Sequence, residues 1–388
     1  MTGKRRRSKS GRRTRIASDG APEKRGASRK KRLIIALTSL FLLLAIAGAA
    51  VYFYFFDGKI LQDWLNLSAL NPVKVPGRLA TCPLDGSVVK DEKLINRRPL
   101  IVKVENLLEA RPQSGLEQAD IVIESMAEGG ITRFAVVYLC RDADEIGPVR
   151  SARQQDIIFI HEYDALFAHV GGSDAWVRDK DGAIADLDEF SFGDAYWRND
   201  DKYAPHNVYT TTTRLHKAAQ AEELEKVAAL DSWAFKADKP AKKGQAGMTV
   251  SVEIPYGADC DTRYDYDYVT NNYLRFVAGE PFTDAVSGRQ LGPKNVVVMY
   301  VNYYSSDDGE EYGLGGTDSM ELVGEGKAVV FRDGVAVEGR WTKSSTSGRT
   351  MFLDAEGRPI EFNRGQIWLE IIPSSWDITL TAGETLLP

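Results

Sequence analysis

The sequence predicts an α/β N-terminal domain and an all-β C-terminal domain, both held outside a membrane by one N-terminal transmembrane helix. Three patterns support this prediction. Residues 33–56 form an apolar run without a charge, residues 96–237 alternate between strand-like and helix-like segments, and residues 248–388 repeat hairpin patterns. These patterns are typical of a membrane span, an α/β fold and a small β sandwich or barrel, respectively.

The apolar run reads LIIALTSLFLLLAIAGAAVYFYFF and contains 24 residues. About 20 apolar residues suffice to cross the hydrocarbon core of a bilayer. A buried helix of a soluble protein would show a polar stripe over this length, and the run shows none. Aromatic residues gather at its far end, as they do at membrane interfaces. We therefore predict a single transmembrane helix over residues 33–56, with membrane lipid as its partner.

The basic tail at residues 1–32 orients this helix. It contains 14 Lys and Arg against two acids, whereas the rest of the chain carries a net charge of −18. Because the positive flank of a span stays inside, the tail is expected in the cytoplasm and the acidic remainder outside the cell membrane. The tail is nearly free of apolar residues and is expected to be disordered. Such a tail can also be a nucleic-acid arm. Beside a span it more often contacts anionic lipid, so no nucleic-acid partner is expected.

Two other anchoring schemes compete with a permanent span. The residues Ala45 to Ala47 resemble a signal-peptide cleavage site, but the apolar run continues nine residues further. A signal peptide has an apolar core of only about 7–15 residues, which disfavours cleavage. A lipid anchor needs a cysteine just after the run, and the first cysteine is Cys82. We therefore expect neither scheme.

The three cysteines, Cys82, Cys140 and Cys260, allow at most one disulfide. The sequence leaves open whether one forms. Cys140 ends an apolar run and is predicted to be a small buried hydrophobic residue.

The order of elements defines the expected domains. Residues 57–95 are a proline-bearing stalk and lead-in. In the α/β domain, residues 96–237, strands are expected at 100–104, 121–126, 131–140 and 165–170, and helices at 151–163 and 213–230. Ser151 is the expected N-cap of the first helix. A polar linker at 238–247 precedes the β domain, residues 248–388, in which hairpin turns are expected at 271–272, 333–334 and 356–357.

Five clusters of Gly, Arg, His and acidic residues stand at the ends of the predicted strands of the α/β domain or in the loops that follow. They read RPQSG at 111–115, AEGGITR at 127–133, GPVRSAR at 147–153, HVGGSDAW at 169–176 and PHNVY at 205–209. Strand ends are where ligand groups gather in α/β folds. These clusters are therefore the predicted functional region.

In this order the clusters resemble those of the YerB-like family of bacterial envelope proteins, a family of unknown function with an N-terminal and a C-terminal part. The resemblance covers the chain from about Arg98 onward. It implies an envelope location and a two-part architecture, but no reaction. Many members are lipoproteins, whereas this chain shows an apolar span and no lipid-accepting cysteine beside it.

Four arginines, Arg111, Arg133, Arg150 and Arg153, are the candidates for an anion site. Arginine binds carboxylate or phosphate groups in bidentate fashion, and a helix N-terminus adds to such a site. Alternatively, each arginine pairs with one of the many acids of the chain. The set of expected ligand-binding residues is completed by Asp174, Asn207 and Tyr209.

Glu128, His169 and His206 are the candidates for proton transfer, because each lies beside Gly or Pro in a predicted loop. With Asp174 or Glu128 the histidines would also suit a metal site of two His and one carboxylate, but no short metal-binding spacing is present, so no metal is expected. The alternative is a structural role, in which these side chains stabilise their loops by hydrogen bonds. Ser173 is a weak nucleophile candidate because the G-x-S-x-G elbow is absent. No phosphate loop or dinucleotide fingerprint occurs, so no cofactor is expected.

The leading hypothesis is a membrane-anchored envelope protein that binds an anionic envelope ligand. A peptidoglycan fragment, a teichoic-type polymer and a lipid pyrophosphate fit this description. A non-catalytic scaffold module is the alternative, and a metal-dependent hydrolase is a third reading. The aromatic residues of the β domain could stack on sugar rings, but alternating aromatic residues are more often cross-strand pairs.

Overall fold

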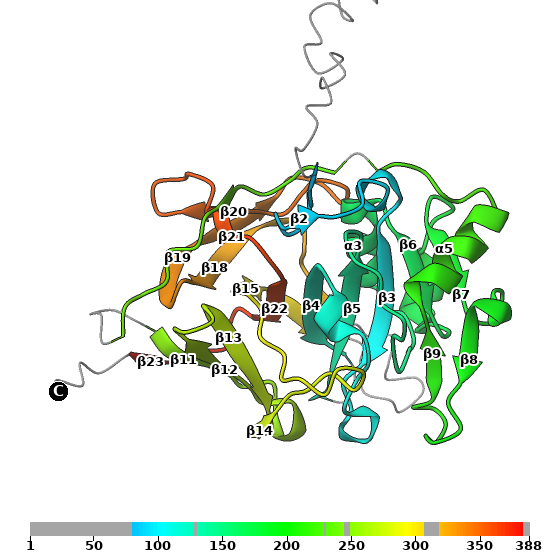
Figure 1. Ribbon diagram of the computed structural model, residues 1–388, viewed down its shortest axis with the longest axis horizontal. Helices are drawn as coiled ribbons and strands as arrows, with labels where there is room; N and C mark the ends of the chain where they lie inside the picture. The colour runs from blue at the N-terminus through cyan, green and yellow to red at the C-terminus, as the bar shows by residue number, and fades with distance from the viewer. Residues whose placement is uncertain (1–79, 128–129, 229, 244–248, 306–317, 383–388) are drawn as a thin grey trace, which may run out of the picture. The chain divides into compact units, whose positions relative to one another are not determined.

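The computed structural model describes residues 80–382 except for residues 128–129, 229, 244–248 and 306–317 (Figure 1). The expected tail, the expected transmembrane run and most of the stalk lie outside the described residues. Within the described part of the chain, no helix has the length and apolar character needed to cross a membrane.

A ten-stranded mixed sheet organises the fold, and it takes strands from both halves of the sequence. In order across the sheet these strands are β20 (Met351–Asp354), β19 (Val335–Lys343), β18 (Gly324–Arg332), β15 (Asn295–Val301), β22 (Ile367–Pro373), β4 (Ile121–Met126), β5 (Thr132–Tyr138), β3 (Leu100–Glu105), β6 (Leu166–His169) and β7 (Ala185–Asp188). The hydrogen-bonded neighbours β22 and β4 join the two halves.

Seven of these strands run in the same direction. The pairs β15–β22, β22–β4, β3–β6 and β6–β7 are parallel, and β5 is antiparallel to both β4 and β3. Strand β18 is antiparallel to both β15 and β19, so β19 runs in the direction of β15. Seven strands therefore end at one edge of the sheet, which we call the carboxyl edge: β19, β15, β22, β4, β3, β6 and β7. Ligands of open α/β sheets bind outside such an edge.

A second sheet of five strands packs on the first. Its order is β14 (Glu280–Pro281), β13 (Asn272–Val277), β12 (Thr262–Asp267), β11 (Thr249–Ile254) and β23 (Thr379–Ala382). Burial alternates along β12 and β13. Their inward rings, including Tyr264 and Tyr273, belong to one apolar cluster with Trp368 of β22. These aromatic residues therefore fill a core, as cross-strand packing predicts.

Short strands and helices complete the unit. The remaining strands are β1 (Ala80–Thr81), β2 (Val88–Val89), β8 (Tyr196–Arg198), β9 (Val208–Thr210), β10 (Phe235–Lys236), β16 (Tyr303–Ser305), β17 (Asp318–Met320) and β21 (Phe362–Asn363). The α-helices are α3 (Asp156–Tyr163), α4 (Asp174–Asp179) and α5 (Thr212–Ala221), and the 3-10 helices are η2 (Leu94–Asn96), η3 (Leu108–Ala110), η4 (Leu116–Gln118), η6 (Gly193–Ala195) and η7 (Ala258–Cys260). Hydroxyl N-caps open α4 and α5, from Ser173 and Thr211.

Two expectations about the helices were wrong in their bounds. The first helix begins at Asp156 and not beside Ser151, because Ala152 forms a β-bridge with Gly172. Backbone pairing there leaves no room for a helical turn. The helix expected at 213–230 ends at Ala221, although helix-forming residues continue beyond it.

The fold class was predicted in part. Mixed α/β structure is present, but the fold is mainly β, and a separate sandwich or barrel over residues 248–388 does not form. The reason lies in β15 and β22, whose side chains are buried on both faces. Strands of this kind need a neighbour on either side and cover on both faces, and the N-terminal half provides these for β22.

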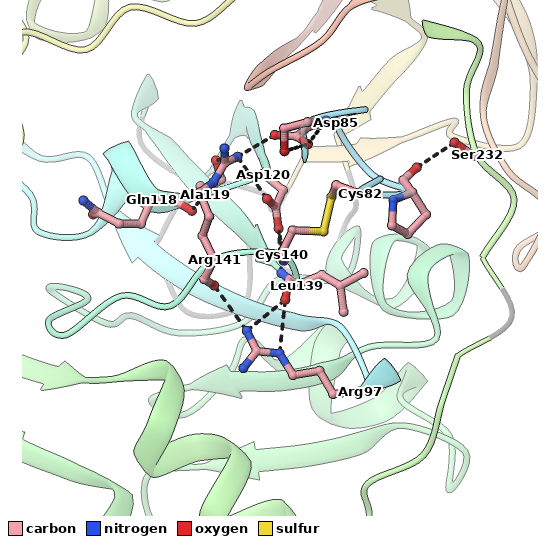
Figure 2. Close-up of a disulfide and its surroundings, with 12 residues drawn as sticks. Cys82, Asp85, Arg97, Gln118, Ala119, Asp120, Leu139, Cys140, Arg141 and Ser232 are labelled. Atoms are coloured by element: carbon pink, nitrogen blue, oxygen red, sulfur yellow. Dashed lines mark hydrogen bonds and ion pairs between the residues drawn. A yellow bond between two sulfur atoms is a disulfide. The ribbon is translucent and has the colours of Figure 1, made fainter. Parts of the chain in front are cut away.

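A disulfide joins Cys82 to Cys140, and both cysteines are buried (Figure 2). Cys140 is therefore a disulfide partner and not only a small buried hydrophobic residue. Beside the bond, Asp120 accepts hydrogen bonds from the backbone of Cys140, and Arg141 contacts both Asp120 and Asp85. The lead-in segment is thereby tied to the chain that follows β5. Cys260 remains a buried free thiol.

Candidate functional site

The segment 147–153, which reads GPVRSAR, lies at the carboxyl edge between β3 and the residues that follow β6. The Arg150 amide donates to the Lys103 carbonyl oxygen at 2.9 Å, and the Arg150 carbonyl oxygen accepts from the Val170 amide at 3.1 Å. The segment thus extends the sheet beyond the end of β6. Its backbone is held on both sides, which fixes the direction of its side chains.

The other four predicted clusters all contact this segment. Ser114 of RPQSG exchanges backbone hydrogen bonds with Gly147, Val208 of PHNVY accepts from Val149, and Gly171 of HVGGS accepts from Ala152. Arg133 of AEGGITR donates from its guanidinium to the Ser151 carbonyl oxygen at 3.1 Å. All five clusters therefore meet at the segment 147–153.

Arg150 and His206 both contact Glu105 in this region, and we call these three side chains the Glu105 cluster. The carboxylate of Glu105, at the end of β3, is fully buried. It lies 2.9 Å from Nε of Arg150 and 2.7 Å from Nδ1 of His206, whose side chains are 20% and 18% exposed. Among the described residues, Nε2 of His206 has no hydrogen-bond partner. A carboxylate on one ring nitrogen orients the imidazole and leaves the other nitrogen available for a ligand.

More cationic groups stand behind the Glu105 cluster. Arg133 and Arg153 both donate to the Ser151 carbonyl oxygen, each at 3.1 Å. Lys103 lies 2.7 Å from Asp156 at the start of α3, and both side chains are fully buried. Burial lowers the pKa of Lys103, and the nearby guanidinium groups of Arg133 and Arg153 lower it further. The region is therefore rich in positive groups that the sheet and α3 hold at short range.

Arg111 does not join this region. Its guanidinium donates to the side chain and backbone of Asn106 at 3.2 and 2.7 Å and lies 3.6 Å from the sulfur of Cys260. Burial lowers the pKa of Arg111. These contacts give Arg111 a bracing role at the loop after β3.

His169 is also placed apart from the Glu105 cluster. Its ring is buried between Phe167 and Trp176. Nδ1 lies 2.6 Å from the Gly171 carbonyl oxygen and Nε2 lies 2.7 Å from Asp186. Both ring nitrogens are thus engaged, as expected for a histidine that braces its loop.

The other predicted residues have different positions. Glu128 lies outside the described residues, and Asp174 is the first residue of α4. Tyr209 is buried, and its ring stacks on Trp197 at 6.1 Å. Burial raises the pKa of Tyr209, and the nearby carboxylates of Glu145 and Glu105 raise it further. Asn207 accepts a hydrogen bond from Arg198 at 3.4 Å.

In the described residues, one group has the spacing of a metal site: Cys82, Asp120 and Cys140. Its two sulfur atoms are joined in the disulfide, so they are not available as thiolate ligands.

The sequence reasoning missed Glu105, which holds the accessible cluster together. The available signal was a charge inside an otherwise apolar strand, because Lys103 and Glu105 interrupt the run LIVKVE of β3. Buried charges of this kind are paired in folded proteins and mark polar networks. The same signal marks Glu124 in β4 and Glu370 in β22.

Comparison with known proteins identifies the class to which this fold and site belong. The chain belongs to the DUF3048 family of proteins of unknown function: residues 84–225 match its N-terminal domain and residues 252–369 its C-terminal domain. The resemblance to the YerB-like family is thereby confirmed.

A particular relative is a protein of Bacillus subtilis (strain 168) described as putative lipoprotein YerB. It is 30% identical over 309 residues, which cover 78% of this chain and 89% of the relative. The crystal structure of YerB from Bacillus subtilis matches with a TM-score of 0.68 and 28% identity, over 78% of this chain and 99% of that chain.

Proposed function

We propose that this chain is a membrane-anchored envelope protein that binds an anionic envelope ligand at the Glu105 cluster. The observation that carries the proposal is the pair of partly exposed cationic or hydrogen-bonding groups, Arg150 and His206, which contact one buried carboxylate. Glu105 keeps both side chains in place before a ligand arrives, so little side-chain freedom is lost on binding.

Three features support a location outside the cytoplasm. The Cys82–Cys140 disulfide is of the kind that persists in oxidising compartments. The apolar run at 33–56 follows a basic tail, which predicts a single-pass span with a cytoplasmic N-terminus. The Bacillus subtilis relative is described as a putative lipoprotein, which is another form of membrane anchor.

The chemistry of the region favours a carboxylate or phosphate ligand. The guanidinium of Arg150 and the Nε2 of His206 are both able to donate to an anionic oxygen. Arg133 and Arg153, which both donate to the neighbouring Ser151 carbonyl oxygen, add positive potential. The charge of Lys103 is balanced by Asp156. Envelope molecules that carry carboxylate or phosphate groups include peptidoglycan fragments, teichoic-type polymers and lipid pyrophosphates. Any proton transfer to the bound ligand falls to His206.

The test is binding of two probes, inorganic pyrophosphate and a soluble muropeptide, to the full chain in detergent micelles. We expect saturable binding by calorimetry that weakens at least tenfold in Arg150→Ala and in His206→Gln. Arg198→Ala is the matched control, because Arg198 is also a surface arginine that pairs with a carboxylate, Glu189. Absence of binding to both probes, or equal loss in the control, would refute the proposal.

A non-catalytic interaction module is the second candidate function. Two aromatic rings near the clusters favour it, because Tyr203 is 90% exposed and Phe190 is 75% exposed. Exposed rings of this size are typical of protein contact surfaces. In a deletion strain, Tyr203→Ser and Phe190→Ser would then abolish complementation, whereas Arg150→Ala would preserve it. The anion-binding proposal predicts the reverse result.

A further inference from the structure

A pocket opens at the carboxyl edge, several strands away from the Glu105 cluster. Its volume is about 160 Å³, and it is lined by the end of β15, the residues before and at the start of β18, and the turn after β22. Strands β15 and β22 are parallel neighbours, so the pocket lies outside two adjacent carboxyl ends. This is the position where α/β sheets bind ligands.

The floor of the pocket is aromatic and rigid. Nε1 of Trp341 donates to the Tyr300 carbonyl oxygen at 2.7 Å, which leaves the indole fixed on the sheet. Gly326 is the strand partner of Trp341, and a Cβ at Gly326 would lie 2.5 Å from Nε1 of the indole. Only glycine therefore permits this approach of the ring to the backbone. Trp376 forms a wall and is only partly buried, with its ring edge-on to Tyr256 at 6.2 Å.

Polar side chains also line the pocket. The amide of Asn302 donates to Glu321 at 2.9 Å and accepts from the hydroxyl of Ser374 at 3.0 Å, so these three side chains form a chain of hydrogen bonds. Exposed charged groups also line the pocket, namely Glu325, Lys327 and Asp377. The pocket thus combines aromatic rings with carboxylate and amide oxygens that can accept hydrogen bonds from hydroxyl groups.

We infer that this pocket binds the pyranose ring of an uncharged saccharide. A sugar ring has an apolar C–H face, which packs on aromatic rings, and hydroxyl groups, which donate to carboxylates and amides. The lining has three carboxylates, Glu321, Glu325 and Asp377, and one ammonium group, Lys327. Arg340 lies 3.0 Å from Glu325 and balances its charge, so one negative charge remains in excess at the pocket. This excess disfavours an anionic sugar. The inference concerns a different site from the anion site and does not depend on it.

The test is calorimetric titration of the full chain, in a detergent without sugar groups, with methyl glucoside, N-acetylglucosamine and glucuronate. We expect saturable binding of the first two in the millimolar range and weaker binding of glucuronate. Trp376→Ala is expected to weaken the binding at least tenfold. Tyr268→Ala serves as the control, because Tyr268 is an exposed aromatic residue that does not line the pocket.

Trp376 also contacts Tyr256, so its removal affects packing. Asp377→Asn provides a second variant, because Asp377 is exposed and the change keeps the side-chain shape. We expect it to weaken binding of the neutral sugars severalfold while the urea midpoint stays unchanged. The inference is overturned if the wild-type chain binds neither neutral sugar, or if folded Trp376→Ala and Asp377→Asn both bind as the wild-type chain does.

Discussion

Glu124 and Glu370 are directly paired residues on the adjacent parallel strands β4 and β22, and their carboxylates share one guanidinium. Arg275, from β13 of the second sheet, lies 2.5 Å from Glu124 and 2.8 Å from Glu370. All three side chains are fully buried. Tyr256 and Tyr264 donate from their hydroxyl groups to Glu370. This cluster is therefore a buried polar connection between the two sheets.

Replacing Arg275 with Met is expected to lower the free energy of unfolding by about 3–5 kcal/mol, because two buried carboxyl groups lose their only cationic partner in the cluster. Urea denaturation of the two chains measures the difference. Arg263→Met is the control: this arginine of β12 is about one-third exposed and pairs with Asp265, so a change of no more than about 1 kcal/mol is expected. Similar losses in the two variants would contradict the assignment.

The pH dependence of stability should report Glu124. Burial is the main cause that raises the pKa of Glu124 to about 8, from an ordinary value of 4.5. The folded chain then holds a proton that the unfolded chain has released, so the free energy of unfolding falls as pH rises from about 4.5 through about 8. One proton corresponds to a slope of at most about 1.4 kcal/mol per pH unit.

Urea denaturation at pH 6, 7, 8 and 9 tests this expectation. Glu124→Gln cannot ionise, so its stability should fall less over the same range. Parallel curves for the wild-type and variant chains would show that another group carries the proton.

Glu162 of α3 should show the opposite dependence. It contacts Lys343, Arg349 and Thr350 of the C-terminal half. Burial alone would raise the pKa of Glu162, but Arg349 and Lys343 lower it below its ordinary value of 4.5. The stabilisation of the folded chain by ionised Glu162 is present above pH 4.5 and is lost as the pH falls through the folded-state pKa of Glu162.

Glu162→Gln is therefore expected to cost about 3 kcal/mol at pH 7, because two cationic groups lose their buried partner. The difference from the wild-type chain should shrink below pH 4.5. Urea denaturation at pH 7, 5 and 4 measures it, and a difference independent of pH would rule out an ionic role.

Loss of the disulfide should destabilise the chain markedly. Cys82 and Cys140 are 58 residues apart, and closing a loop of that length corresponds to about 4 kcal/mol in the chain-entropy account. The double change Cys82→Ala and Cys140→Ala should lower the free energy of unfolding by roughly that amount. Under denaturing conditions, thiol titration should find one free thiol in the wild-type chain and three after reduction. Three thiols before reduction would show that the bond is absent.

Apolar periodicity was enough to locate most strands. The runs expected at 100–104, 121–126 and 165–170 became β3, β4 and β6 within one or two residues. Strands buried on both faces appear in the sequence as continuous apolar runs, because side chains on both faces pack against apolar neighbours. The hairpin turn at Asp333–Gly334 was equally visible, because both residues adopt the positive φ that the turn requires.

The composition of the candidate site was partly visible as well. Glycine, arginine and histidine clusters at strand ends pointed to the region around 147–153, and Arg150 and His206 do meet there. Their meeting point, Glu105, was not predicted: a charge inside an apolar run indicates a buried polar network, but the sequence does not show which side chains pair with it. The sequence could not show that His169 and His206 have different roles. The difference depends on tertiary contacts: Gly171 occupies Nδ1 of His169 and Asp186 occupies its Nε2.

The sequence by itself determined the positions of the strands, the clusters that accompany them and the family to which the chain belongs. Only the tertiary structure decided that both halves share one sheet, and which charges pair across it. The physical reason is the separation along the sequence over which each kind of interaction acts. Periodicity and turn chemistry act between residues a few positions apart. The partners of Glu105, which are Arg150 and His206, lie 45 and 101 positions away, and the two carboxyl partners of Arg275 lie 95 and 151 positions away. Burial alone selects these partners.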